Sequence, residues 1–381
     1  MLLGFSRGQN MYKRSFLVVM TLSFCLIFGF HPDEVHSRKL KLIKPGDLFP
    51  ETYLLVPADP RDREYLGLLE GEFFTLKEIK ADLVVVETLS IYCLSCRKQM
   101  APYNKLFNLI ENDPTTRGRI KIIGIAVGNG EALVKKFRKK YKIRFPIIPD
   151  PEFALHRAIG GGRTPFTIYV RQDPDGQTAV VADTHLGKNT KYERLFQELR
   201  TMVTVDLAAI RQDSKLKEAA TIVVKPILTE LELQEKVKGL FSTFTGKVAQ
   251  FQKVTLKNAG EIYIGLIEHE GTSRRLFARV TSRPATCDLC HDIHFIYVFD
   301  SSGEVLRFEP IQLTKGGNKT WNEADLAKMR ERVLGRYIFT PYSFNPEVDA
   351  VSSATITSAI IIDAIFRGED LLQKLRGKGL I

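Results

Sequence analysis

Residues 83–89 read Leu-Val-Val-Val-Glu-Thr-Leu, and a pair of cysteines, Cys93 and Cys96, follows this apolar run almost at once. A strand with so little polar alternation is typical of a parallel sheet that helices cover on both faces. Beyond Cys96, apolar side chains such as Met100 and Leu106 recur at helical spacing. The order strand, cysteine pair and helix predicts the core of an α/β domain. Because a helix N-terminus lowers the pKa of a thiol placed there, Cys93 is the expected nucleophile.

The same alternation of strands and helices continues through residue 202. We predict further strands at residues 120–126, 145–148, 166–170 and 178–182, and helices at residues 131–141, 153–159 and 192–202. These elements place the first domain at residues 40–205. A polar and charged linker at residues 206–224 then separates it from the rest of the chain.

The first domain resembles the thioredoxin superfamily, specifically the membrane-associated periplasmic thiol reductases. The resemblance implies that Cys93 attacks a partner disulfide, that Cys96 resolves the mixed disulfide, and that Glu87 is the buried acid that passes a proton to the second thiol. Thr164 and Pro165 match the cis-proline loop of that family. In the family this loop lies beside the disulfide and holds the substrate backbone.

The chain departs from the family pattern next to the cysteines. Tyr92 stands where the family usually has Trp, and Leu94-Ser95 replaces the commoner dipeptides between the cysteines. Because the dipeptide tunes the reduction potential, the direction of electron flow stays open. Peroxidase activity is not expected, since Val86 stands where a peroxiredoxin needs proline. The plainer alternative is a stable structural disulfide.

The C-terminal part of the chain contains a small-residue stretch before a mainly apolar, helix-length segment at residues 359–375. The stretch includes Asp349, Ser352, Ser353, Ala354 and Thr355. Serine and threonine are common N-cap residues, so we expect one of them to begin the helix. A phosphoester on Thr355 would then meet unpaired N–H groups and the positive end of the helix dipole. The plainer alternative is an ordinary capped helix.

This stretch resembles the flavin attachment motif of extracytoplasmic FMN-binding domains. The resemblance implies that a flavin transferase esterifies the Thr355 hydroxyl with the phosphate of FMN, and that Asp349 and residues 352–354 complete the motif. The family usually carries glycine where this chain has Ser353. Upstream, helices at residues 230–241 and 323–333 and strands at residues 253–256, 261–268, 276–281, 293–300 and 304–308 predict an α+β domain at residues 225–381.

A second cysteine pair, in Cys287-x-x-Cys290-His291, permits three interpretations. Cys-x-x-Cys-His is the attachment signature of c-type haem. Alternatively, Cys287 and Cys290 form a dithiol that exchanges electrons with Cys93/Cys96 or with the flavin. The third interpretation is a zinc site that adds His291 or His294.

Residues 1–30 combine a basic flank, Lys13-Arg14, with an apolar run and predict a signal peptide or an N-terminal anchor. Cys25 lies within this run. The net charge is +11, yet lysine and arginine are interspersed with acidic residues, so we expect no nucleic-acid partner. The basic run at residues 135–140 is interpreted as the solvated face of a helix.

The combined prediction is an exported electron-transfer oxidoreductase that couples a thioredoxin-like dithiol to covalent FMN. Its expected partners are extracytoplasmic protein thiols or disulfides, a flavin transferase for maturation, and a membrane electron donor. Two alternatives use the same residues: a thiol-handling chaperone or cytochrome-maturation factor, and a subunit of a membrane redox complex. Bound flavin distinguishes the first alternative from the oxidoreductase.

Overall fold

The computed structural model describes residues 38–173, 176–213, 218–257, 259–286 and 290–381, all within one compact unit, Val35–Ile381. The predicted signal segment and Cys287 lie outside the described residues. Among the residues that are described, no helix is both long enough and apolar enough to cross a membrane.

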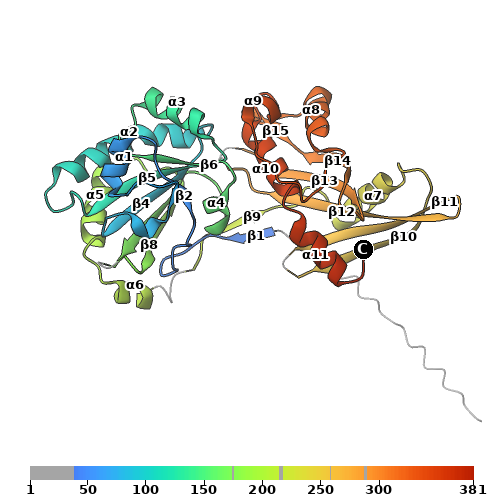
Figure 1. Cartoon of the computed structure of the whole chain (residues 1–381), viewed down its shortest axis with the longest axis horizontal. Coiled ribbons are helices and arrows are strands. Elements are labelled where there is room, and N and C mark those ends of the chain that lie inside the picture. Colours follow the sequence, from blue (N-terminus) through green and yellow to red (C-terminus); the bar gives the residue numbers. More distant parts are fainter. Residues whose placement is uncertain (1–37, 174–175, 214–217, 258, 287–289) are drawn as a thin grey trace, which may run out of the picture. The chain divides into compact units, whose positions relative to one another are not determined.

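The first half of the unit is built on a mixed five-stranded sheet (Figure 1). Its strands are β4 (Leu83–Leu89), β5 (Ile120–Val127), β6 (Ile147–Asp150), β7 (Phe166–Gln172) and β8 (Ala179–Leu186). They lie in the order β6-β5-β4-β7-β8. Strands β4, β5 and β6 are parallel, whereas β7 is antiparallel to both β4 and β8. Every residue of β4 is buried, which confirms the prediction of a covered central strand.

Helices cover both faces of this sheet. The helices are α1 (Pro60–Leu66), α2 (Leu94–Asn112), α3 (Glu131–Tyr141), α4 (Ala154–Ala158) and α5 (Tyr192–Met202). Apolar side chains of α2, α3 and α5 pack with Leu83 and Val85 on one face. Those of α1 and α4 pack with Val84 and Val86 on the other. Alternate residues of one strand therefore enter two separate cores, which explains the continuous apolar run.

Two short strands join the beginning and the end of this half. Strand β1 (Arg38–Lys41) pairs antiparallel with β9 (Thr221–Val224), and Arg38 lies opposite Val224. The predicted linker thus contains a paired strand as well as a helix, α6 (Leu207–Asp213). Smaller elements lie before β4: β2 (Leu54–Leu55), β3 (Phe73–Phe74) and η1 (Leu76–Glu78).

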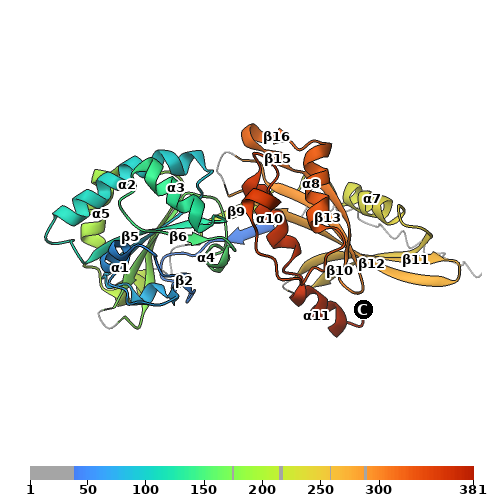
Figure 2. The ribbon, with the colours of Figure 1, turned by 45° about the horizontal axis from the view of Figure 1, so that its top comes forward.

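The second half is built on an antiparallel sheet whose five strands follow one another in chain order (Figure 2). They are β10 (Lys247–Leu256), β11 (Gly260–His269), β12 (Thr272–Arg283), β13 (Ile293–Asp300) and β14 (Val305–Gln312). Helix α7 (Glu230–Phe241) packs on one face. The other face is covered by α8 (Glu323–Val333), α10 (Thr355–Ile365) and α11 (Glu369–Gly377). The remaining short elements are β15 (Thr314–Lys315), η3 (Gly316–Asn318), β16 (Lys319–Thr320) and α9 (Pro346–Asp349).

The structure corrects the single helix expected at residues 359–375. Helix α10 ends at Ile365 and α11 begins at Glu369. The break is a packing requirement, because the Gly368 N–H donates to the carbonyl of Ile338 at 2.7 Å. A Cβ at Gly368 would lie 2.6 Å from the Ile338 side chain, so no larger residue fits there without movement.

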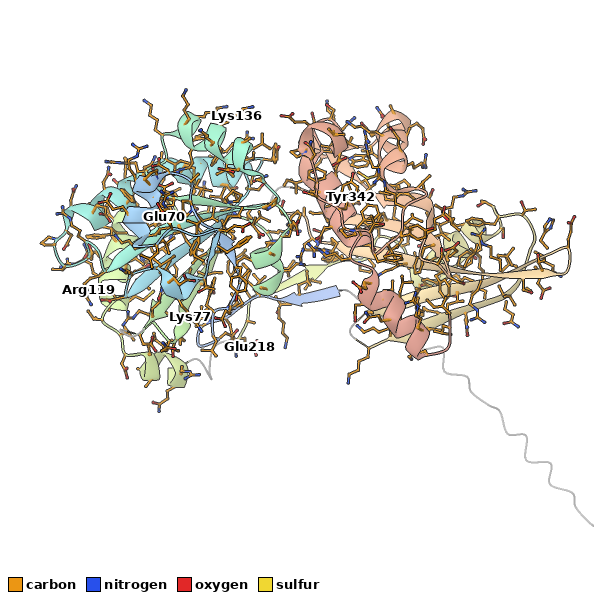
Figure 3. All side chains as sticks on the ribbon, viewed as in Figure 1. Glu70, Lys77, Arg119, Lys136, Glu218 and Tyr342 are labelled. Carbon is orange, nitrogen blue, oxygen red and sulfur yellow. The ribbon has the colours of Figure 1, made fainter. Side chains whose placement is uncertain are left out.

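The basic run at residues 135–140 lies on α3, as predicted. Lys135, Lys136, Lys139 and Lys140 are exposed, whereas Phe137 is buried in the core below them. Figure 3 shows Lys136 on the outer side of this helix. The run is therefore the solvated face of an amphipathic helix.

Candidate active site

Cys93 and Cys96 lie at the start of α2, directly after the central strand. Cys93 is the N-cap residue of the helix, and its Sγ accepts a hydrogen bond from the Cys96 N–H at 3.3 Å. This bond stabilises negative charge on the sulfur, as the first turn of a helix does for anions. Both cysteines are buried, with Cys93 only 1% exposed. Cys93 therefore lies at the helix start that the sequence predicts, and its role as the nucleophile stays a prediction.

The peptide bond between Thr164 and Pro165 is cis, and β7 begins at the next residue. The Thr164 carbonyl accepts a hydrogen bond from Cys93 Sγ at 3.4 Å. The fold therefore brings this loop against Cys93 across 71 residues of sequence. It is the juxtaposition that the resemblance implied.

Glu87 is wholly buried in the middle of β4, between hydrogen-bond donors. The Gln99 amide donates to Oε1 at 2.5 Å and the Thr167 hydroxyl donates to Oε2 at 2.6 Å. Tyr103 extends this polar cluster through a 2.9 Å bond with Thr167. Burial raises the pKa of Glu87 from 4.5 to about 8, although the hydrogen bonds from Thr167, Tyr103 and Gln99 oppose that rise. A carboxyl group with this pKa can give or take a proton near neutral pH.

We expect Glu87→Gln to slow the resolving step of disulfide exchange by about 100-fold, a typical contribution of a positioned acid or base. In the wild type this step should accelerate as pH rises through about 8, because Glu87 then ionises and accepts the proton of the resolving thiol. This acceleration with pH should be absent in Glu87→Gln. Stopped-flow decay of a preformed mixed disulfide on Cys93 measures it.

Unfolding supplies the control for this variant. Because the folded protein holds the Glu87 proton up to about pH 8 and the unfolded chain only up to about 4.5, wild-type stability should fall as pH rises through this interval. Glu87→Gln should remove that part of the slope. An unchanged pH profile in both kinetics and unfolding would contradict the assignment.

Another segment, which the sequence did not identify as part of this site, reaches the cis-proline loop. The Thr286 carbonyl accepts from the Thr164 N–H at 2.7 Å and from the Thr164 hydroxyl at 2.5 Å. Asp292 Oδ1 accepts from the Ala285 N–H at 3.1 Å and from Arg163 at 3.0 Å. The contacts with Thr164 and with Arg163 join residues more than 120 positions apart, so no local pattern could have indicated them.

The small-residue stretch places Thr355 at the first position of α10. The cap residue is Ala354, which makes no side-chain cap bond, so the expected serine or threonine cap is wrong. A serine within the helix bonds to the preceding loop instead: the Ser358 hydroxyl accepts a hydrogen bond from the Val351 N–H at 3.0 Å. Ser353 has φ +60°, in the left-handed region that glycine favours. The Gly316 N–H donates a hydrogen bond to the Ser353 carbonyl at 2.8 Å.

Asp349 is buried and anchors the loop before this stretch. It accepts from the Tyr342 hydroxyl and from the Asn345 N–H, both at 2.7 Å. The Tyr342 ring stacks on Phe366 at the end of α10, with centroids 5.0 Å apart, and Figure 3 labels Tyr342. Burial, together with Asp349, raises the pKa of Tyr342 to about 12. Asp349 therefore positions the loop through its own hydrogen bonds.

The second cysteine pair is described only in part, because Cys287 lies outside the described residues. Cys290 and His291 are exposed. His294 is buried in β13, where Nδ1 shares a 2.9 Å hydrogen bond with Ser282 and burial lowers the pKa of the ring. Within the described ranges, no group of three His, Cys, Asp or Glu residues is placed to hold a metal ion. The haem and zinc interpretations both need Cys287 and stay predictions.

The sheet order, the cysteine pair at the start of α2 and the cis-proline loop define the first half as a thioredoxin-like domain. The chain is similar to the thiol-disulfide oxidoreductase ResA of Halalkalibacterium halodurans, with 24% identity over 135 residues, or 35% of this chain and 70% of the relative. ResA of Bacillus cereus is 28% identical over 123 residues, which cover 32% of this chain and 65% of the relative. No family model matches the chain.

Solved structures of similar proteins were also found. StoA from Bacillus subtilis aligns with 43% of this chain and 97% of its own, at 16% identity and a TM-score of 0.27. A secreted thiol-disulfide isomerase from Corynebacterium glutamicum aligns with 46% of this chain and 95% of its own, at 18% identity and a TM-score of 0.32.

Proposed function

We propose that the protein is an exported oxidoreductase that exchanges electrons between the Cys93/Cys96 dithiol and FMN held covalently on Thr355. Its external substrates are extracytoplasmic protein thiols or disulfides, and its maturation needs a flavin transferase. A membrane electron donor completes the proposed route. The similarity to ResA proteins, which are named thiol-disulfide oxidoreductases, supports the dithiol part of this proposal.

The geometry around Cys93 supports thiol-disulfide exchange. The sulfur accepts a helix N-terminal N–H, and the cis-proline loop lies against it. In the proposed reaction the Cys93 thiolate attacks one sulfur of a disulfide and releases the other as a thiol. Cys96 then attacks Cys93 Sγ, which breaks the mixed disulfide and releases the second substrate sulfur as a thiolate that takes a proton, and Glu87 takes up the proton that Cys96 loses. Two electrons pass from the dithiol to the substrate disulfide.

The residues around Thr355 fit a phosphoester of FMN. The hydroxyl lies in the first turn of α10, where backbone N–H groups lack helical partners and favour an anion. No hydrogen bond joins this hydroxyl to any residue that the structure describes. The positive φ of Ser353 also explains why the flavin attachment motif usually carries glycine at this position. When bound, FMN would supply transfer of one or two electrons.

One segment of the chain contacts both the loop beside Cys93 and the loop beside the Thr355 stretch, and this observation supports electron exchange between the dithiol and FMN. Thr286, before the second cysteine pair, is bound to Thr164 beside Cys93. His291, directly after that pair, donates its N–H to Asn318 at 3.2 Å. Asn318 ends the short helix η3, whose first residue, Gly316, is hydrogen-bonded to Ser353. The second cysteine pair therefore lies in the chain between contacts to the dithiol site and contacts to the Thr355 stretch.

Electron exchange within FMN-loaded protein tests the proposal. Under anaerobic conditions, FMN is first reduced with a reagent that does not cleave disulfides, and Cys93 and Cys96 should then become reduced and able to react with an alkylating reagent. In the reverse experiment, protein with reduced cysteines and oxidised FMN should lose the absorbance of the oxidised flavin. Both directions are needed, because a difference of about 30 mV in a two-electron couple shifts the equilibrium about tenfold. Mass spectrometry of alkylated peptides measures the redox state of the cysteines, and the absorption spectrum measures that of the flavin.

The matched control is flavin-free Thr355→Val protein, in which the same reagent should leave the cysteines oxidised. If loaded wild-type protein shows no exchange in either direction, the coupling is wrong and the second half serves docking instead.

A further inference from the structure

A cavity of about 410 Å³ lies along α10, between that helix, residues 341–344 and the turn at residues 151–153. Its lining is mainly aromatic and aliphatic and includes Phe153, Tyr342, Phe344, Ala359, Ile362 and Phe366. Pockets of a few hundred Å³ with a mostly apolar lining and a few polar groups are typical of small-molecule and cofactor sites. Because aromatic rings favour offset-stacked and edge-to-face contacts with one another, this lining suits a flat aromatic ligand.

The cavity lies on the same face of α10 as Thr355. Ala359, Ile362 and Phe366 line it, and they follow Thr355 by four, seven and eleven residues. Residues at these spacings share one face of a helix. At 1.5 Å per residue, Ala359 is about 6 Å from Thr355 along the helix axis. A group attached to the Thr355 hydroxyl therefore starts one helical turn from the cavity.

The first half of the chain supplies one wall of this cavity. Arg157 of α4 and Arg367 both donate to Asp363 Oδ1 at 2.6 Å, and the Asp363 side chain is only 6% exposed. The same two arginines donate to the Glu152 carbonyl, at 2.5 and 3.1 Å. Figures 1 and 2 show α4 beside α10. These bonds hold the turn at residues 151–153 against α10, so both halves of the chain bound the cavity.

We propose that this cavity holds the isoalloxazine ring of FMN, an inference that rests on the covalent attachment at Thr355 proposed above. The phosphate stays at the first turn of α10, and the flexible ribityl chain spans the single turn to Ala359. The ring then lies between Tyr342 and Phe344 of the second half and Phe153 of the first. The half that does not carry the attachment site thus contributes to flavin binding, which places the ring where the two halves meet.

The charges at the wall predict an effect on the flavin itself. Three guanidinium groups, those of Arg157, Arg283 and Arg367, surround the single carboxylate of Asp363. Of these arginines, Arg367 lines the cavity. Charge near the ring is one means by which a protein tunes a flavin, and positive charge favours the electron-rich reduced form. Arg367 should therefore raise the reduction potential of the bound FMN.

Fluorescence of full-length, FMN-loaded protein tests where the ring lies. A tyrosine in contact with oxidised flavin quenches its fluorescence by electron donation to the excited ring, whereas phenylalanine does not. Tyr342→Phe should therefore raise the fluorescence per attached FMN severalfold, with FMN content measured after denaturation. Tyr337→Phe is the matched control, since it removes the same hydroxyl from a residue that stacks on Phe339 and is not among the described residues lining the cavity.

The reduction potential provides a second, independent measurement. Arg367→Gln should shift the flavin potential to a more negative value, measured by titrating the flavin absorbance against dyes of known potential. Arg376→Gln is the control, because it removes the same charge from an exposed position on α11 and should leave the potential unchanged. Thermal unfolding of each variant checks that the fold is kept.

The outcomes separate this inference from the proposed function. If FMN is attached to Thr355 but Tyr342→Phe and Arg367→Gln behave as their controls do, the ring lies elsewhere and only this inference fails. Wild-type fluorescence per FMN equal to that of free FMN would likewise indicate a ring in solvent and overturn it. An unmodified Thr355, despite an active transferase, would overturn both this inference and the covalent FMN proposal.

Discussion

Replacing Cys93 by serine is expected to abolish disulfide exchange, whereas Cys96→Ser should accumulate mixed disulfides on Cys93. The reason is positional: Cys93 caps α2 and accepts the Cys96 N–H, and it faces the Thr164 carbonyl. A serine hydroxyl at this position is not ionised near neutral pH and cannot form a disulfide. Reduction of insulin and non-reducing gels of protein from an exporting host measure the two effects.

The two single variants control for each other, because Cys93 and Cys96 are both buried and the substitutions have the same size. Equal trapping by both variants would remove the assignment of Cys93 as the attacking thiol. Trapping by Cys93→Ser alone would reverse the two roles.

Thr355→Val is expected to remove the covalent flavin entirely. Valine has nearly the shape of threonine but no hydroxyl to esterify, and the first turn of α10 should otherwise be unchanged. After co-expression with a flavin transferase in an exporting host, denatured wild-type protein should keep yellow fluorescence in a gel. The variant should have none, and peptide mass spectrometry should locate the FMN adduct on Thr355.

Thr357→Val is the matched control for flavin attachment. The Thr357 hydroxyl donates to the Thr314 carbonyl at 3.1 Å, so its loss should cost about 1 kcal/mol of stability while the flavin stays attached. An unmodified Thr355 in wild-type protein, despite an active transferase, would contradict the covalent FMN proposal.

The first half of the chain was predicted well because its signals are local. Helix α3 has the predicted bounds, residues 131–141. Val134 and Phe137 are three residues apart, so both lie on the buried face of the helix, and this spacing is visible in the sequence. The continuous apolar run of β4 likewise identified a strand covered on both sides. The position of Cys93 followed from the order of these elements.

In the second half, several features depend on weak sequence patterns or on contacts between residues that are distant in sequence. Strand β10 begins at Lys247, six residues before the predicted start, because this edge strand is largely exposed and its polar residues give a weak alternating signal. The break between α10 and α11 depends on Ile338, which is distant in sequence. The contact between Thr164 and Thr286 depends in the same way on folding of both halves, so it could not be predicted from local patterns.

The pairing of β1 with β9 has a consequence for how an N-terminal tether would act. Arg38 and Val224 lie opposite each other on neighbouring strands, which are about 5 Å apart in a sheet. A pull on the residues before 38 would therefore reach the beginning of the second half across this ladder, and the core of the first half through Leu40 and Ile222. A tether at the N-terminus would thus hold the chain at the junction of its two halves.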